Sequence, residues 1–291
     1  MPAPKARGAW TNWSEPGGNR NSTPSYAYLE RIMKRLLSVY AWLVFAFLYL
    51  PIVVIVALSF NKSRYGVSWT GFTLEWYSRL FANERVLEYL GNTLVVATVS
   101  TTVSTIIGTL LAVGLVRYRF RLQNGLRYLL YTTVVVPDIV MGISLLLLFA
   151  EVRSLIGWPR LSLLTIILGH ISFQIAYVTL VVRARLMLLD PALEEAALDL
   201  GANNWRTFRE VTLPLISPGV VSGALLAFSL SLDDFVVTFF TSGSGSTTLP
   251  LYIYSAVKLG VSPEIHALST LMVGATILVL VLGVLFWRNR G

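Results

Sequence analysis

Six long apolar segments alternate with shorter polar stretches along the 291 residues of the chain. Each contains the ~20 predominantly apolar residues that a helix needs to cross a bilayer. They lie at 36–60, 90–116, 128–149, 162–182, 220–240 and 265–286. This pattern predicts an all-α integral membrane protein with six transmembrane helices, in a membrane domain that covers residues 36–290.

The residues before the first apolar segment differ in character. Residues 1–30 are rich in Pro, Gly, Asn and Ser and show no apolar period, which predicts a disordered cytoplasmic tail over residues 1–35. The first apolar segment is longer than a signal-peptide core and has no small-residue cleavage site at its end. We therefore expect it to stay in the protein as a membrane anchor.

Composition supports the membrane class. Hydrophobic residues make up 55% and charged residues 13% of the chain, with a mean hydropathy of +0.67, which is too apolar for a soluble domain of this size. The sequence has no cysteine and so no thiolate metal ligands. His170 and His266 have no cysteine or carboxylate at ligand spacing, so we expect no metal site and interpret both as helix–helix hydrogen bonders.

Basic residues indicate how the spans are oriented. With the N-terminus inside, most of the 23 Lys and Arg residues fall in cytoplasmic segments, as the positive-inside rule expects. Both termini and residues 190–214 are then cytoplasmic. This topology explains the net charge of +8, so nucleic acid is not needed as a partner.

Residues 190–214 form a charged, amphipathic stretch between two spans. Asp190 before Pro191 is typical of a helix start, and Gly201 of a helix end. We expect a second short amphipathic helix to follow and Pro214 to close it. Helices this short are not stable alone in water, so they should dock on a partner. The apolar face of the first helix consists of Leu193, Ala196, Ala197 and Leu200.

The spacing of this stretch resembles the Glu-Ala-Ala loop of ABC importer permeases. The matching residues are Glu195, Ala196, Ala197, Gly201, Leu213 and Pro214, with Val211 where the family pattern has Ile. The resemblance implies a type I importer permease fold in a bacterial inner membrane, and a coupling helix that docks on a cytoplasmic ATPase subunit. An alternative is a helix pair lying on lipid headgroups. Three acids and no Lys or Arg in the first helix disfavour it.

Three carboxylates fall inside predicted spans: Asp138 after Pro137, and the neighbours Asp233 and Asp234. A charge there costs at least ~2.5–3.5 kcal/mol, so these acids should line water, meet a cation or be protonated. For Asp138, a protonated acid bonded to carbonyls that Pro137 frees is an equal alternative. Asp233 and Asp234 lie ~100° apart on a helix. One should face a central path, and the other should bond to a neighbouring helix.

Aromatic residues near these acids offer ring faces to an ammonium group, although packing or lipid contact explains each of them equally well. They are Phe228, Phe235, Tyr252 and Tyr254. Phe228 and Tyr254 join the three acids as candidate residues of a substrate path. Before the last span, residues 242–260 hold a Gly/Ser run followed by about nine apolar residues, which predicts a re-entrant or interfacial helix on the outer side.

Residues 134–149 and 230–268 are similar to stretches in permease subunits of spermidine and putrescine importers, especially the putrescine type. The likeness covers about residues 35–290. It implies a heterodimer of two permeases, two ATPase subunits that bind ATP and Mg²⁺, and an outer solute-binding protein. It also implies a polyamine as substrate, whose separated charges suit uncompensated carboxylates. A permease for another small solute stays open as an alternative.

The chain contains no P-loop, because none of its four lysines follows a glycine. We therefore expect no enzyme activity, ATP hydrolysis in separate subunits, and transport by alternating access. A secondary transporter driven by protons or ions explains the acids but not the 190–214 stretch, and no inverted repeat is visible. An intramembrane enzyme lacks a nucleophile–base pair or a metal constellation.

Overall fold

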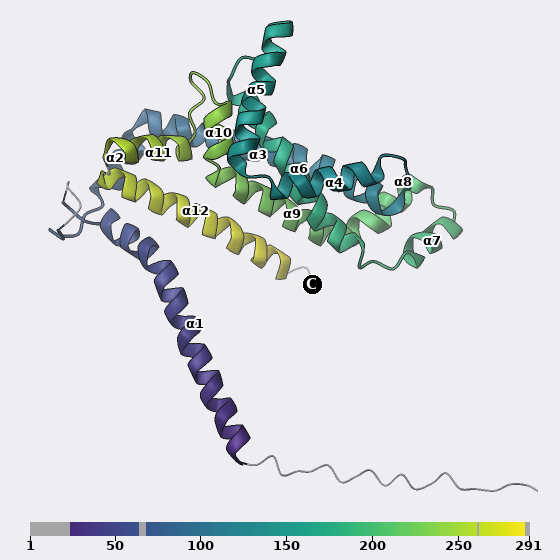
Figure 1. The fold of residues 1–291 in the computed structure, drawn as a ribbon, viewed down its shortest axis with the longest axis horizontal. Coiled ribbons are helices and arrows are strands. Elements are labelled where there is room, and N and C mark those ends of the chain that lie inside the picture. The colour runs from purple at the N-terminus through teal and green to yellow at the C-terminus, as the bar shows by residue number, and fades with distance from the viewer. Residues whose placement is uncertain (1–23, 64–67, 261, 289–291) are drawn as a thin grey trace, which may run out of the picture. The chain divides into compact units, whose positions relative to one another are not determined.

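The computed structural model describes residues 24–63, 68–260 and 262–288. In these ranges the chain forms helices and one isolated bridge, between Asn61 and Phe72 (Figure 1). A shorter apolar stretch, Pro263–Val279, accompanies five segments that are long and apolar enough to cross a membrane. Those five are Arg31–Ser59, Glu84–Arg117, Asp138–Ile156, Leu163–Leu186 and Asn204–Asp233. The expected all-α membrane fold is confirmed.

The first helix, α1 (Pro24–Ser59), belongs for most of its length to a separate unit that ends at Val54. Residues 1–23 of the predicted tail lie outside the described residues, but residues 24–35 are helical, so the prediction of disorder is wrong for them. After Pro24 this segment is rich in strong helix formers such as Leu, Glu, Arg, Met and Lys. It also continues into a long apolar helix, which removes the cost of a separate nucleus.

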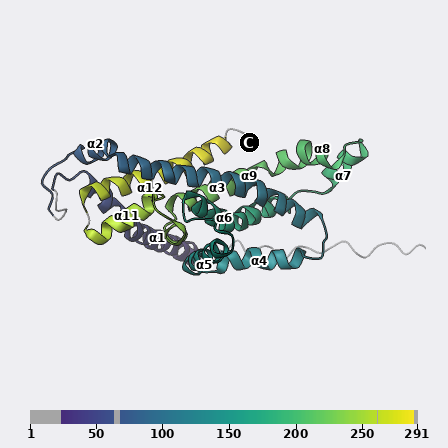
Figure 2. The same cartoon turned by 90° about the horizontal axis from the view of Figure 1, so that it is seen from above.

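From Ile55 onward the chain forms a second unit. At its centre, α3 (Glu84–Arg117), α6 (Leu163–Leu186) and α9 (Leu213–Asp233) pack against one another (Figures 1 and 2). A stripe of small residues on α3 is buried in this contact, and a Cβ at Gly108 would lie 2.8 Å from Cγ1 of Val178. The stripe therefore serves close helix packing. Its members are Ser100, Ser104, Gly108 and Ala112.

Short helices lie at the two ends of this bundle. At one end lie α2 (Glu75–Ala82) and α11 (Leu249–Leu259), and the long helix α12 (Pro263–Arg288) begins there and contacts α9. At the other end lie α7 (Ala192–Asp199) and α8 (Asn204–Thr207) (Figures 1 and 2). An apolar cluster joins the first group to α3 and consists of Trp76, Leu80, Val86, Leu249, Ala267 and Leu268.

Two of the predicted spans are broken. The predicted span 128–149 consists of α4 (Gln123–Val135) and α5 (Asp138–Ile156), which run in different directions (Figure 1). Pro137 has no N–H and forces the residue before it out of the helical region, so the helix stops and restarts. The predicted span 220–240 likewise consists of α9 and α10 (Val236–Thr241). The apolar pattern predicts each as one span; Pro137 marks the first interruption, but the break after Asp233 was not predicted.

Pro214 does not close a helix, contrary to the sequence prediction. Helix α8 runs through a π-helical turn, Phe208–Thr212, into α9, whose first turn contains Pro214. In that turn Leu213 N–H donates to the carbonyl of Phe208. A proline ring clashes with the carbonyl four residues earlier in a regular helix. The widened π turn accommodates the ring, and the chain stays helical.

Candidate functional site

A pocket of about 300 Å³ lies where the two helix breaks meet. The break between α4 and α5 contributes Val136 and Asp138, and the break between α9 and α10 contributes Asp233, Asp234 and Phe235. Helix α6 adds Phe173 and Tyr177. None of the residues that line the pocket is Lys or Arg. The pocket is therefore a concave site whose ionisable groups are all acids.

The three acids predicted from sequence meet in this pocket, although they come from two distant parts of the chain. Asp138 is the first residue of α5 and is exposed. The positive end of the helix dipole there favours a negative charge. Asp233 is the last residue of α9 and is also exposed. No other described residue forms a hydrogen bond or ion pair with either carboxylate, although Asp233 accepts one from its own backbone N–H, so both are open to a ligand.

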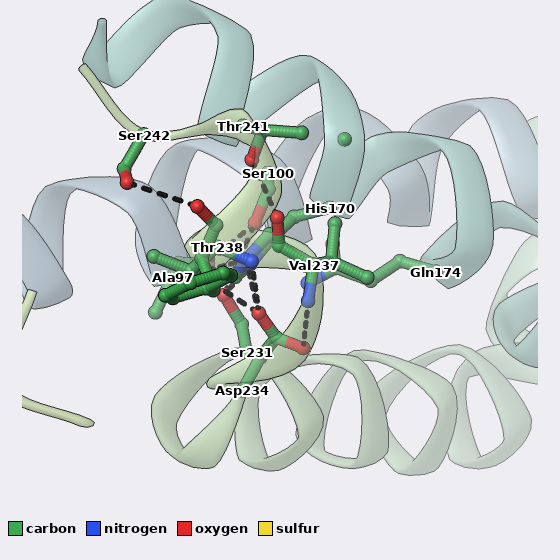
Figure 3. A network of polar contacts seen from close by, with 12 residues as sticks. Ala97, Ser100, His170, Gln174, Ser231, Asp234, Val237, Thr238, Thr241 and Ser242 are labelled. Atoms are coloured by element: carbon green, nitrogen blue, oxygen red, sulfur yellow. Dashed lines mark hydrogen bonds and ion pairs between the residues drawn. The ribbon is translucent and has the colours of Figure 1, made fainter. Parts of the chain in front are cut away.

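Asp234 is different, because neighbouring groups of the protein form hydrogen bonds with its carboxylate (Figure 3). Oδ2 accepts hydrogen bonds from the backbone N–H and the hydroxyl of Thr238, both at 2.8 Å. Oδ1 accepts from the backbone N–H of Val237 at 3.3 Å. The imidazole Nε2 of His170 lies 3.2 Å from Oδ2. Asp234 thus satisfies free N–H groups in the first turn of α10, as a helix cap does.

His170 completes this network. Its side chain is only 1% exposed, and Nδ1 lies 2.7 Å from the hydroxyl of Ser231 on α9. Nε2 lies 3.0 Å from the hydroxyl of Thr238 on α10. The imidazole therefore joins α6 to α9 and α10, which confirms the prediction of a helix–helix hydrogen bonder. The contact of Asp234 with α6 likewise confirms that one member of the acidic pair bonds to a neighbouring helix.

Helix ends of both polarities lie at the pocket. Helix α4 ends at Val135 and α9 ends at Asp233, and residues at both ends line the pocket. The last carbonyls of a helix have no partner within it, and they form the negative end of its dipole. The first turns of α5 and α10 also line the pocket and carry the positive ends of their dipoles, so the open carboxylates, rather than the helix ends, make the pocket favour a cation over an anion.

The aromatic residues divide into three groups. Phe235 lines the pocket, and Tyr254 on α11 stacks on it with ring centroids 4.1 Å apart, although Tyr254 does not line the pocket itself. Phe228 is half-buried on α9 and does not line the pocket. Phe173 and Tyr177 line it but were not predicted. Phe173 lies three residues after His170 and Tyr177 four residues after Phe173, a helical-face spacing that could have identified them.

The 190–214 stretch lies at the far end of the bundle, in α7 and α8 (Figures 1 and 2). As predicted, Asp190 accepts a hydrogen bond from Ala192 N–H at the start of α7, at 2.9 Å. Gly201 ends the helix with a φ of +89°, which a glycine adopts easily. Ala202 N–H donates to the Ala197 carbonyl at 3.0 Å, and Gly201 N–H donates to that of Leu198 at 2.9 Å. These two bonds form a Schellman motif.

Part of this loop packs against the bundle and part faces away. Leu213 packs against the apolar cluster of α3, α6 and α9, while Glu195, Ala196 and Pro214 are exposed. Large apolar side chains are exposed beside them, led by Leu200 at 90%. Such a patch is typical of a contact surface. Its other large members are Leu193, Leu198 and Trp205.

Comparison with known proteins identifies the family. Residues 104–288 match the model described as "Binding-protein-dependent transport system inner membrane component". The chain belongs to this family. The permease is 46% identical over 233 residues to the putrescine transport system permease protein PotI of Escherichia coli strain K12, covering 79% of the permease and 83% of PotI. It is 43% identical over 251 residues to the spermidine/putrescine transport system permease protein PotC of Haemophilus influenzae, covering 86% and 96%.

Solved structures show the same fold. The permease aligns with a bacterial ABC transporter involved in alginate import at a TM-score of 0.68 and 20% identity, covering 90% of the permease and 98% of that chain. It aligns with the MetNI methionine ABC transporter at a TM-score of 0.58 and 18% identity, covering 76% and 100%. The predicted ABC importer permease fold and the inner-membrane location are therefore confirmed.

Proposed function

We propose that the permease carries a polyamine of the putrescine or spermidine type through the inner membrane, as a transmembrane subunit of an ATP-driven importer. The observation that carries this proposal is the pocket at the two helix breaks. It combines open carboxylates and aromatic faces, and no Lys or Arg lines it. The related PotI and PotC are named for putrescine and spermidine transport.

The pocket chemistry fits an alkyl diamine. Asp138 and Asp233 come from opposite helix breaks and have no partner on another described residue, so each is available to one ammonium group. Phe173, Tyr177 and Phe235 offer rings to the methylene chain and to a cation. The volume of about 300 Å³ is at the lower end of ligand pockets. Asp234 supports the break without contacting substrate.

The energy source and partners follow from the other end of the bundle. The exposed apolar face of α7 and α8 is the docking surface for a cytoplasmic ATPase subunit, which binds ATP and Mg²⁺, and two such subunits serve a heterodimer of permeases. A solute-binding protein delivers the polyamine from outside. The permease itself binds no cofactor and no nucleic acid. Docking and the pocket communicate through the helix that runs from Asn204 to Asp233.

Other transport modes have less support. A proton- or ion-coupled secondary transporter would use the acids but would leave the exposed loop without a role. A permease for a different small solute shares the fold, as the alginate and methionine transporters show, but their substrates give no reason for an all-acid pocket.

The decisive experiment is uptake by the assembled complex in lipid vesicles. In vesicles whose lumen contains the ATPase subunits, the complex should accumulate labelled putrescine or spermidine only when the lumen also contains ATP. Amino acids serve as control solutes. Transport of amino acids with no uptake of polyamines would refute the substrate. Accumulation by the permease alone, driven by an ion gradient, would refute the coupling.

A further inference from the structure

Glu194 in the 190–214 stretch forms an ion pair that belongs neither to the exposed apolar face of that stretch nor to the pocket. Arg117 is the last residue of α3, and its Nε lies 2.8 Å from Oε2 of Glu194 in α7. Its Nη2 donates to Oε1 of the same carboxylate at 3.1 Å. Both side chains are only 19% exposed. The Nε contact is at ion-pair distance but lacks hydrogen-bond geometry, so one hydrogen bond and one close charge contact join the two side chains.

Glu194 has a third partner. Its Oε1 accepts a hydrogen bond from the hydroxyl of Thr212 at 2.8 Å. Thr212 is buried and is the last residue of the π-helical turn that leads into α9. One carboxylate therefore binds the end of α3 and the start of α9 while it is carried by α7. A small cleft of about 90 Å³ lies beside these three residues, so they sit at a joint with free space rather than in a filled core.

We propose that Arg117, Glu194 and Thr212 form a three-way strut that transmits a displacement of α7 to α3 and α9 together. The proposal rests on the function proposed above. Glu194 is a positioning residue here: it lies beside Glu195 in the sequence, but it faces the bundle while Glu195 is exposed. Helix α9 carries Asp233 at its far end and α3 packs along it. A push on α7 then moves the wall of the pocket as a unit.

The π turn between α8 and α9 explains why a direct connection from α7 to α9 matters. Such turns lack the regular hydrogen-bond spacing of an α-helix and recur at functional sites. If α7 pushed on α8 alone, the turn at Phe208–Thr212 would absorb part of the motion before it reached α9. The bond from Thr212 to Glu194 bypasses the turn. The force enters α9 directly at the residue before its first turn.

The test compares the assembled wild-type transporter with Glu194→Gln, Arg117→Gln, the charge swap Arg117→Glu with Glu194→Arg, and Thr212→Val. Three quantities are measured: co-purified ATPase subunit, ATP hydrolysed and putrescine imported. Glu210→Gln is the matched control, because Glu210 is an exposed acid in the same stretch and pairs with exposed Arg206 at 3.0 Å. It should leave all three quantities at wild-type levels.

The expected result is normal assembly with about fivefold more ATP hydrolysed per putrescine imported in Glu194→Gln and Arg117→Gln. Thr212→Val should also raise the ATP hydrolysed per putrescine imported. The charge swap should bring this ratio at least part of the way back to the wild-type value. An unchanged ratio in the single variants overturns the strut. Loss of assembly in proportion to loss of uptake, with no recovery in the swap, also overturns it, because the pair would then only stabilise the fold. Absence of ATP-dependent polyamine uptake by the wild type would instead refute the proposed function.

Discussion

The imidazole Nε2 of His170 lies 3.2 Å from the carboxylate Oδ2 of Asp234, and this contact joins α6 to the first turn of α10. Both side chains are shielded, with exposures of 1% and 9%. His170 also contacts the hydroxyls of Ser231 and Thr238, and Asp234 also accepts from Val237 and Thr238, so the pair is the link between two groups that are both anchored at the break. The pair therefore fixes the start of α10 against α6, so that α9 and α10 do not form one continuous helix. That break leaves the neighbouring Asp233 free to face the pocket.

Asp234→Ala should destabilise the folded permease while Asp233→Ala should not. Removal of the Asp234 carboxylate leaves the backbone N–H groups of Val237 and Thr238 without their side-chain acceptor and breaks the contact with His170, and we expect a loss of about 1–3 kcal/mol. Asp233 is exposed at the end of α9, so its removal costs no buried contact. Thermal unfolding of the two purified variants, followed by tryptophan fluorescence in the same detergent, checks the order. A lower midpoint for Asp233→Ala than for Asp234→Ala would contradict the division of roles.

Asp233→Asn and Asp138→Asn should each lower the rate of putrescine uptake by about tenfold or more. A hydrogen bond to a charged group is worth about 1.5–3 kcal/mol, and every 1.4 kcal/mol is a factor of ten. Asp233→Glu keeps the charge and is the control, with a smaller expected loss. Initial uptake rates are compared at equal amounts of assembled complex. Full uptake by the double variant Asp138→Asn with Asp233→Asn would place the cation path elsewhere.

The sequence predicted the acids of the pocket but not their arrangement. Apolar periodicity located the helices, and the cost of a buried charge singled out Asp138, Asp233 and Asp234. The sequence around the break after Asp233 contains no Pro or Gly that would predict a helix end there. It depends on Asp234 capping α10, and that cap is held by His170 from a helix more than sixty residues earlier in the chain. A signal of that kind is tertiary and cannot be read from a local pattern.

Local chemistry was a better guide in the 190–214 stretch, with one exception. Asp190 and Gly201 cap α7 as their residue types predict. Pro214 was expected to end a helix, and the structure instead places a π turn before it. Proline forbids a regular turn but does not choose between a break and a widened turn. The bond from Thr212 to Glu194, which comes from the fold, supports the widened turn.

Gly201→Ala should weaken docking of the ATPase subunit without affecting membrane insertion. A Cβ at Gly201 would meet no atom within 4 Å, so the effect comes only from its φ of +89°. A left-handed backbone costs about 1–2 kcal/mol for an ordinary L-residue. The strain should loosen α7 and reduce the ATPase subunit recovered with the permease. Co-purification at fixed subunit concentration measures this.

Gly201→Asn is the control for that experiment, because asparagine tolerates the left-handed conformation better than alanine does. It should retain more of the ATPase subunit than Gly201→Ala although its side chain is larger. If the two variants lost the subunit in order of side-chain size, a steric clash with the partner would be the cause and the conformational explanation would fail.

Gly108→Ala should destabilise the bundle, whereas Gly114→Ala on the same helix should not. At Gly108 the new Cβ would lie 2.8 Å from Cγ1 of Val178 and 3.2 Å from the carbonyl oxygen of Ile175. Val178 is stiff and fully buried, so α3 and α6 must separate, at about 1–3 kcal/mol. At Gly114 no atom lies within 4 Å, and the better helix propensity of alanine should stabilise α3 by up to about 1 kcal/mol. Unfolding midpoints that move in opposite directions support this packing, and equal midpoints contradict it.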